Sequence, residues 1–273
     1  MFRNQYDSDA ITWSPQGRLH QVEYAMEAVK QGSCAVGLKS STHVVLLGLK
    51  RSAHELSTHQ KKVLYIDDHI GCAIAGLTSD ARMLSKFMRT ECLHSKFAFE
   101  TPMPIQRLVA KLGDKAQVTT QQYGGRPYGV GLLIGGFDKI AGPKLYQFCP
   151  SANFFDCQAM AIGSRSQSSR TYLERNLSKF LNAKRDELII YGLHALRDSL
   201  PNNYELTVHN TSVLVVSANE VCKLIEEEEI AKLLSQLESR SKREETIEGE
   251  EVGTKKDSEQ EQHERDLSMQ LDE

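Results

Sequence analysis

The sequence of 273 residues lacks the features that mark membrane proteins and secreted proteins. Its apolar runs fall well short of the roughly 18 residues that a membrane-spanning helix needs. The N-terminus carries no apolar segment of the kind that directs secretion. We therefore expect an intracellular protein that has no membrane partner.

Patterns for binding metals, forming disulfides and holding phosphates are missing as well. The six cysteines form no C-x-x-C pair and several lie in apolar runs, so they are expected to be reduced and buried. The nine histidines form no H-x-x-x-H cluster, which argues against a metal site. Neither a phosphate-binding loop nor a G-x-S-x-G nucleophile elbow is present. The sequence therefore predicts no metal and no cofactor.

Charge is divided unevenly behind a net value of −3. Between Glu226 and Glu273 lie 17 acidic and 7 basic residues, while the rest of the chain holds 19 acidic and 26 basic residues. A basic body with an acidic tail can belong to a nucleic-acid binder, and this alternative stays open. However, the basic residues are scattered and no aromatic-flanked basic stripe is present, so we expect no nucleic-acid partner.

The apolar pattern predicts paired strands that alternate with paired helices. Short, nearly continuous apolar runs indicate strands covered on both faces, and apolar residues at helical spacing indicate helices with one buried face. This order favours an α+β architecture of two stacked sheets with helices outside. Helices are expected at residues 18–31, 79–97 (capped by Thr78), 105–121, 166–181 and 185–199. Strands are expected at residues 34–38, 44–49, 63–66, 70–75, 130–136, 144–149, 159–162, 213–217 and 221–225.

The composition changes after residue 225. Four apolar residues at helical spacing predict one short helix there, and the remainder is charged and nearly free of aromatic residues, which is typical of disorder. The four residues are Ile230, Leu233, Leu234 and Leu237. We therefore predict three parts, which are an N-terminal arm with a proline turn (1–17), a folded body (18–225) and an acidic, mostly disordered tail (226–273).

The first 32 residues have the most distinctive organisation. The sequence Ser14-Pro15-Gln16-Gly17 predicts a tight turn, because proline fixes φ and glycine allows a positive φ. After the turn, an amphipathic helix is expected to end at Gly32 in the left-handed conformation. A polar arm is thus joined to an anchored helix through a proline turn. The apolar stripe of this helix consists of Leu19, Val22, Met26 and Val29.

Several short sequence motifs in this stretch resemble the N-terminal signature of alpha subunits of the 20S proteasome. They are Tyr6-Asp7, Ser14-Pro15-Gln16-Gly17-Arg18, Gln21-Val22-Glu23-Tyr24-Ala25, and Glu27-Ala28-Val29-Lys30 followed by Gly32. The resemblance extends to about residue 225 and implies the four-layer α-β-β-α sandwich of the N-terminal nucleophile hydrolases. From periodicity alone, the alternative is an ordinary surface helix with a frayed terminus.

The resemblance implies a subunit that helps to build a compartment. In this family, a seven-membered ring of different alpha subunits stacks on beta subunits, and a regulatory particle or other activators dock on its outer face. The N-terminal arms close the entry pore, and the complex serves ubiquitin-dependent protein degradation in the cytoplasm and nucleus. The helix at 18–31 is then the expected contact between ring neighbours, because its apolar stripe would otherwise lie exposed.

Residue by residue, the resemblance implies a gate and a docking pocket. The gate residues are Tyr6, Asp7, Pro15 and Tyr24, and the docking residues are Gly32 and Lys62. Two phenols and a carboxylate can hydrogen-bond between neighbouring arms, while the proline fixes where each arm leaves the body. Ser8 departs from the family, which often has arginine there, so one possible ion pair is lacking. As alternatives, the tyrosines simply pack onto the ring and the lysine is solvated.

Ser33 stands where the catalytic beta subunits of the same superfamily begin their nucleophilic strand. In that branch propeptide cleavage frees a threonine, whose amine helps to activate its hydroxyl. Here Ser33 follows an intact helix, and Leu49 occupies the position that resembles that of the beta-branch acid. Only Lys62 remains of that constellation, so no catalytic residue is expected. The open alternative is an active N-terminal nucleophile peptidase that uses Ser33.

Overall fold

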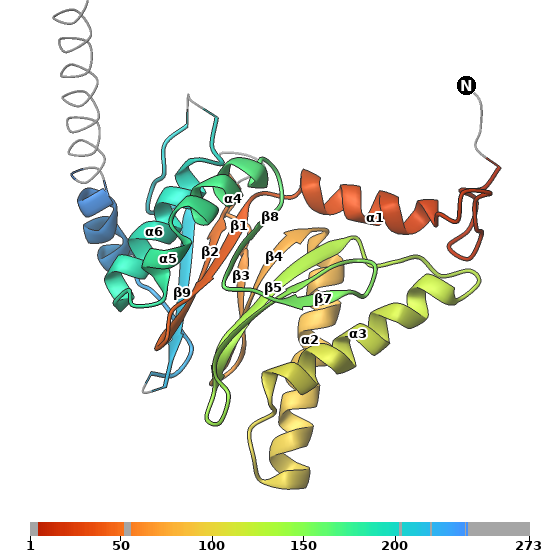
Figure 1. Ribbon diagram of the computed structural model, residues 1–273, viewed down its shortest axis with the longest axis horizontal. Coiled ribbons are helices and arrows are strands. Elements are labelled where there is room, and N and C mark those ends of the chain that lie inside the picture. Colours follow the sequence, from red (N-terminus) through yellow and green to blue (C-terminus); the bar gives the residue numbers. More distant parts are fainter. Residues whose placement is uncertain (1–4, 52–55, 202–203, 219, 238, 240–273) are drawn as a thin grey trace, which may run out of the picture.

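The computed structural model describes residues 5–51, 56–201, 204–218, 220–237 and 239. In this part of the chain two five-stranded sheets lie face to face, and helices cover both outer faces (Figure 1). Every strand pair is antiparallel. The expected four-layer α-β-β-α sandwich is confirmed.

The two sheets divide the strands by position in the chain. Sheet A has the order β10-β9-β2-β1-β8, and sheet B has the order β3-β4-β5-β6-β7. The strands of sheet A are β1 (Ala35–Lys39), β2 (His43–Leu49), β8 (Ala159–Ile162), β9 (Thr211–Ser217) and β10 (Lys223–Leu224). Those of sheet B are β3 (Val63–Asp67), β4 (Ile70–Gly76), β5 (Val130–Asp138), β6 (Gly142–Phe148) and β7 (Phe154–Asp156).

The helices form the two outer layers. Buried side chains of α2 (Thr78–Phe99) and α3 (Ile105–Gln121) share an apolar cluster with sheet B. Sheet A is covered in the same way by α4 (Ser166–Arg175), α5 (Leu177–Phe180) and α6 (Arg185–Arg197). None of the described helices is long and apolar enough to cross a membrane.

A third apolar layer lies between the sheets. Leu46 and Leu214 of sheet A are fully buried against Leu133 and Leu145 of sheet B. Burying one such side chain contributes about 1.5–3 kcal/mol. At Gly71 an added Cβ would lie 2.5 Å from Leu214 Cδ2, so glycine is needed for the sheets to approach this closely. Because these strands are covered on both faces, their sequences read as continuous apolar runs.

Three local predictions differ from the structure. The helix expected at 166–181 is divided into α4 and α5 around Asn176. Thr78 is the first residue of α2 and not its cap, since Leu77 occupies the capping position. Strand β7 was not predicted, because its three residues are all exposed and show no alternation of apolar and polar side chains.

The described part of the predicted tail begins with a helix at residues 227–237. The four apolar residues expected to carry that helix are buried in the same cluster as sheet A and α6. The composition change after residue 225 is therefore not accompanied by a break in packing. Residues 240–273, which hold most of the segment expected to be disordered, lie outside the described residues.

Candidate functional site

The arm folds back against α1 (His20–Gln31) through Asp7. The Tyr24 hydroxyl donates a hydrogen bond to Asp7 Oδ2 at 3.1 Å, and the Gln21 side-chain amide donates to the Asp7 carbonyl. The hydrogen bond to this carboxylate raises the pKa of the Tyr24 phenol. Two of the four predicted gate residues are thus brought together, while Tyr6 is half-buried on the same arm. Because Tyr24 is 48% exposed, this contact lies at the surface.

The proline turn connects the arm to the helix. The Gly17 amide donates to the Ser14 carbonyl at 2.9 Å, and Gly17 has a φ of +73°, which favours glycine. The Arg18 amide donates to Ser14 Oγ at 3.0 Å, and this closes the turn on the side of the helix. Pro15 is exposed at the first central position of the turn. The predicted turn is confirmed.

The start of α1 is stabilised by two side-chain contacts that the sequence did not reveal. Arg18 donates two hydrogen bonds to Glu23, each at 2.7 Å, and the ring of His20 stacks on that of Tyr24 at 6.1 Å. Both contacts fix the orientation of the helix surface that the arm touches. In the sequence these contacts are visible only as pairs of suitable residues four or five positions apart near the first helical turn.

The apolar stripe of α1 does not lie on a single free surface. Val22 and Val29 are each 9% exposed within the chain itself, and Val29 belongs to the apolar cluster between the sheets, on the side where α1 contacts β4 and β5. Val29 lies so close to β5 that a Cβ at Gly131 would be 2.8 Å from its Cγ1. Met26 is 42% exposed. The expectation that the whole stripe would be exposed without a ring neighbour is therefore wrong for Val22 and Val29.

Gly32 ends α1 in an extended conformation, with φ −67° and ψ 152°. The expected left-handed stop is therefore wrong. Glycine is required there for a different reason, since a Cβ would lie 2.2 Å from the backbone nitrogen of Gly76. The Gly32 carbonyl accepts a hydrogen bond from the Ser164 amide at 2.7 Å, so this residue is fixed from both sides.

Ser33 is buried at the entrance to β1 and is 5% exposed. Its hydroxyl donates a hydrogen bond to the carbonyl of Leu49 at 2.8 Å. The side chain of Leu49 belongs to the apolar cluster of sheet A, so it offers no group that could orient a base or move a proton. The hydroxyl of Ser33 therefore acts as a donor to the backbone of a neighbouring strand.

Lys62 is 2% exposed, so the alternative of a solvated lysine is wrong. Its stem lies against β2, because a Cβ at Gly48 would be 2.8 Å from Lys62 Cβ. Burial, together with the nearby Arg51, lowers the pKa of this ammonium group to about 8, and the Cys34 thiol acts in the opposite direction. No described hydrogen bond or ion pair supplies a counter-charge to this group, and a buried cation in that state is costly.

The other titratable groups near the strands serve packing. All six cysteines are free thiols, and four of them are buried, namely Cys34, Cys72, Cys92 and Cys222. Burial raises the pKa of Cys34 and makes thiolate chemistry unfavourable there. Within the described ranges, no three His, Cys, Asp or Glu side chains are grouped so that they could hold a metal ion.

A further contact that the sequence did not reveal holds the loop beside α1. Arg126 donates to both carboxylate oxygens of Asp80, at 2.7 and 2.9 Å, and the Gly129 amide donates to the same group at 2.9 Å. These bonds lower the pKa of Asp80, so the pair stays ionised. The Gly129 carbonyl in turn accepts from the Leu77 amide at 2.9 Å, which joins this loop to the start of α2.

Two stacked antiparallel sheets between helical layers, with a serine at the entrance to the first strand and a buried lysine nearby, define the class of the N-terminal nucleophile hydrolase sandwich. The family model for proteasome subunits matches residues 29–216, and the model for the N-terminal signature of A-type proteasome subunits matches residues 6–28. The chain therefore belongs to the proteasome subunit family and carries the signature of its alpha type.

Curated relatives support the same assignment. A probable alpha type-6 subunit of the proteasome from Schizosaccharomyces pombe is 55% identical, over 87% of this chain and 87% of its own length. The alpha type-1 subunit of the proteasome from Dictyostelium discoideum is 52% identical, over 88% and 96%. That of Drosophila melanogaster is 56% identical, over 76% and 77%. The amino-acid sequence of residues 1–6 and 26–32 resembles that of the type-1 alpha subunit. This agrees with the Dictyostelium and Drosophila relatives, which are both named type-1.

Proposed function

We propose that this chain is a non-catalytic subunit of the alpha ring of a 20S proteasome. It would sit beside other alpha subunits in a seven-membered ring, above beta subunits and below a regulatory particle or another activator. The work of the complex would be ATP- and ubiquitin-dependent protein degradation in the cytoplasm and nucleus. One observation carries the proposal, namely that the arm is folded onto α1 through Asp7 and Tyr24, while α1 itself contacts β4 and β5 of the body.

The surroundings of Ser33 support the view that this chain has no active site of its own. A nucleophile of this class needs a free amine next to its hydroxyl, and Ser33 continues directly from α1 and Gly32. Its hydroxyl is engaged with the Leu49 carbonyl, and Leu49 supplies no carboxylate. Lys62 alone cannot replace the missing groups, because such residues act as a unit. These observations weigh against the alternative of a peptidase that uses Ser33.

Gating would use the arm as a movable segment. The contacts of Asp7 with Tyr24 and Gln21 lie at or near the surface, so releasing the arm requires little apolar burial to be lost. The turn around Pro15 would keep the point of departure fixed while the arm changes its contacts. Ser8 offers no ion pair that could strengthen one arrangement over another.

Docking would use the buried charge of Lys62. The carboxylate at the end of an activator segment would supply the counter-charge that lowers the cost of burying this ammonium group. Since Lys62 is 2% exposed, the carboxylate has to displace the side chains that cover it. Gly32 would contribute indirectly, because the absence of a Cβ lets the end of α1 lie against the backbone of Gly76.

The contact between ring neighbours would involve the outer face of α1 and the arm. Met26 is 42% exposed and Trp13 is 63% exposed, so both offer apolar surface to a neighbour in the ring. Val22 and Val29 instead hold the helix to its own body. This divides the stripe into an internal half and an external half.

Native mass spectrometry of the assembly purified through a tag on this chain tests the proposal. The expected result is a 20S particle with this chain in the alpha ring, present in cytoplasmic and nuclear fractions. Recovery of a monomer that binds RNA or DNA with salt-sensitive affinity would instead support the nucleic-acid alternative and overturn the proposal.

A further inference from the structure

Sheet A ends in an open edge at β10. Among the described residues β9 is the only strand paired with β10, through Lys223 with Val215 and Leu224 with Leu214. Just before the strand, the Cys222 amide donates to the Asp68 carbonyl at 2.7 Å, so the open part of the edge is at Leu224. Val221 and Leu224 on this edge are 61% and 46% exposed. An exposed edge with apolar side chains is a surface to which an extended segment of another chain can pair as an added strand.

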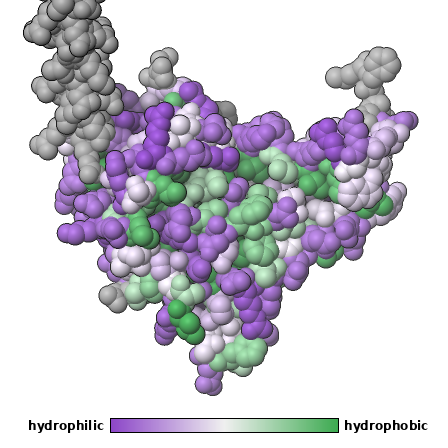
Figure 2. Space-filling view, in the orientation of Figure 1, coloured by the Kyte–Doolittle hydropathy of each residue, from purple (hydrophilic) through white to green (hydrophobic). Residues whose placement is uncertain are grey.

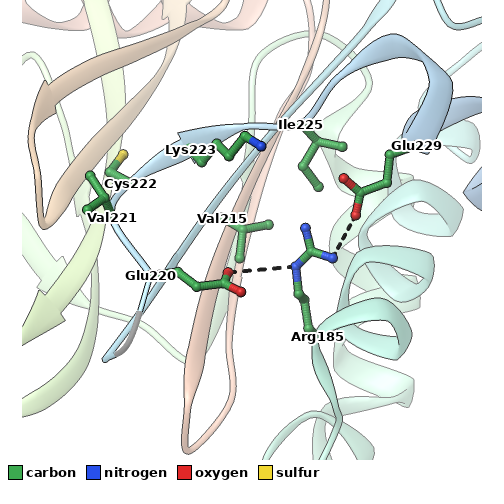
Figure 3. Close-up of a pocket in the computed structure, with 8 residues that line it drawn as sticks. All are labelled: Arg185, Val215, Glu220, Val221, Cys222, Lys223, Ile225 and Glu229. Atoms are coloured by element: carbon green, nitrogen blue, oxygen red, sulfur yellow. Dashed lines mark hydrogen bonds and ion pairs between the residues drawn. The ribbon is translucent and has the colours of Figure 1, made fainter.

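A cavity of about 560 Å³ opens beside this edge, on the face of sheet A that the helices cover (Figure 3). Its floor is apolar, because Val215 and Ile225 are 2% and 7% exposed and belong to the core cluster of that face. Its rim is charged, with Arg185 from the start of α6, Glu220 from the loop before β10, and Glu229 from the helix at 227–237.

Two cations and two carboxylates line the cavity. The charge around it is negative only because Asp186 and Glu226, just outside the lining, contact those cations. Arg185 Nη1 lies 2.6 Å from Glu229 Oε1 and 3.3 Å from Asp186 Oδ1. Its Nε is 3.9 Å from Glu220 Oε2, which is too long for a hydrogen bond, and this buried Nε has no hydrogen-bond partner among the described residues. One guanidinium thus faces three carboxylates.

Of these three carboxylates, Glu220 lies farthest from the guanidinium of Arg185. Its side chain is 55% exposed, and Figure 3 shows it across the cavity from Arg185. The remaining lysine of the rim, Lys223, lies 3.7 Å from Glu226, so that pair adds no net charge. A cationic side chain that entered the cavity would therefore gain the interaction with Glu220 that Arg185 does not complete.

We propose that this edge binds an extended segment of a partner protein that carries a lysine or arginine, and that this basic side chain enters the cavity between Glu220 and Glu229. A strand added beside β10 turns alternate side chains toward the helix-covered face, where the cavity lies. Apolar residues between the basic ones would face the opposite side of the sheet, where Leu224 lies beside its partner Leu214. The proposal does not depend on the function proposed above.

Fluorescence anisotropy with two labelled nonapeptides tests this site on the full chain. One peptide alternates valine with lysine, and the other alternates valine with glutamate. The lysine peptide is expected to bind, and Glu220→Gln should weaken it about threefold, as for the loss of one exposed ion pair. Glu220→Lys should weaken it about tenfold, because attraction becomes repulsion. Glu227→Gln, an exposed carboxylate on the neighbouring helix, is the matched control and should change nothing.

Four results would overturn the proposal. The glutamate peptide could bind as well as the lysine peptide, which would assign the site to Arg185 and Lys223. The lysine peptide could fail to bind at millimolar concentration. It could also bind equally to the Glu220 and Glu227 variants, which would mean that the net charge of the protein, and not Glu220, determines its affinity. Finally, the chain could form a concentration-dependent dimer through this edge that the lysine peptide does not displace, which would make a second copy the occupant.

Discussion

Lys62 and the pair Asp7–Tyr24 are the residues to which we assign the proposed docking and gating, and their surroundings differ. Lys62 is a buried cation near Arg51 and the Cys34 thiol, and no described hydrogen bond or ion pair gives it a counter-charge. Asp7 and Tyr24 form a surface hydrogen bond between the arm and α1. The first arrangement costs stability in the isolated chain, whereas the second adds little, so both suit contacts that change when a partner binds.

Replacing Lys62 by methionine should raise the free energy of unfolding below pH 8, by up to about 3 kcal/mol at 1.36 kcal/mol per pKa unit. The folded-state pKa is about 8 and the ordinary value is 10.5, so the unfolded chain binds more protons between these values. Stability of the unaltered chain should therefore rise with pH from about 8 to 10.5, and this part of the rise should vanish in the variant.

Urea unfolding between pH 7 and pH 10.5 measures this difference. Lys61→Met, which changes an exposed neighbour, is the control and should keep the pH dependence of the unaltered chain. An identical slope in all three proteins would show that Lys62 is not desolvated in the folded state.

Tyr24→Phe should release the arm without unfolding the body. The substitution removes the hydroxyl that donates to Asp7 and leaves the ring, so about 1 kcal/mol or less of arm stability is lost. Hydrogen exchange of residues 5–12 should become several-fold faster, and peptide hydrolysis by the closed assembly should increase. As a control, Tyr65→Phe on β3 removes a similar tyrosine–aspartate hydrogen bond, that to Asp68, far from the arm. It should change neither the hydrogen exchange of residues 5–12 nor the rate of peptide hydrolysis. Equal exchange in both variants would remove Tyr24 from the gate.

At the scale of elements, α1 has two functions on two faces. Its buried residues are Val22, Ala25 and Val29, and the helix contacts β4 and β5. The loop held by Arg126 and Asp80 lies beside it, since a Cβ at Gly129 would be 3.8 Å from Ala28 Cβ. Figure 1 shows α1 reaching beyond the sandwich with the arm at its far end. The element is therefore anchored along one side and free along the other.

Val22→Asp and Met26→Asp should separate these functions. The first places a charge on the inner face, which costs several kcal/mol, so the chain should lose its fold. The second places a charge on a residue that is 42% exposed, so the melting temperature should stay nearly constant while the chain fails to enter the ring. Thermal unfolding and native gels measure the two outcomes.

Met26→Gln, which is polar and uncharged, should still enter the ring at reduced efficiency. Normal incorporation of Met26→Asp would exclude this face from the contact between neighbours.

The sequence predicted elements well where one pattern dominated and poorly where tertiary contacts decided. Helix α3 was expected at its observed bounds, because Pro104 directly precedes it and its apolar residues recur at helical spacing. The reason for Gly32 could not be seen, since the close approach of Gly76 is distant in sequence. Likewise, periodicity assigned Val22 and Met26 to one stripe, but only the position of the sheets shows which of them is covered.

The candidate site was predictable in part for the same reason. Tyr24 and Asp7 stand in words that resemble a known signature, and the structure brings them together. Gln21, which donates to the Asp7 carbonyl, and Arg18, which donates to Glu23, stand in the same segments but carry no pattern that singles them out. The burial of Lys62 depends on the packing of β2 and β3, which no local pattern reports.

At the scale of the whole molecule, the surface is not uniformly polar. Figure 2 shows apolar areas between polar ones on the visible face. Exposed side chains such as Phe97 (80%) and Trp13 (63%) lie on different elements, the first on α2 and the second on the arm. Apolar surface in several separate places suits a subunit with several neighbours.

The central claim is that the segment before Ser33 stays attached and that the reactive hydroxyl belongs to a different polypeptide of the complex. Intact mass spectrometry of this chain from the purified active assembly, after treatment with an electrophile that labels N-terminal nucleophiles, tests it most directly. We predict a polypeptide that still contains residues 5–32 and carries no label. A chain that begins at Ser33, carries the label and hydrolyses peptides would contradict the account.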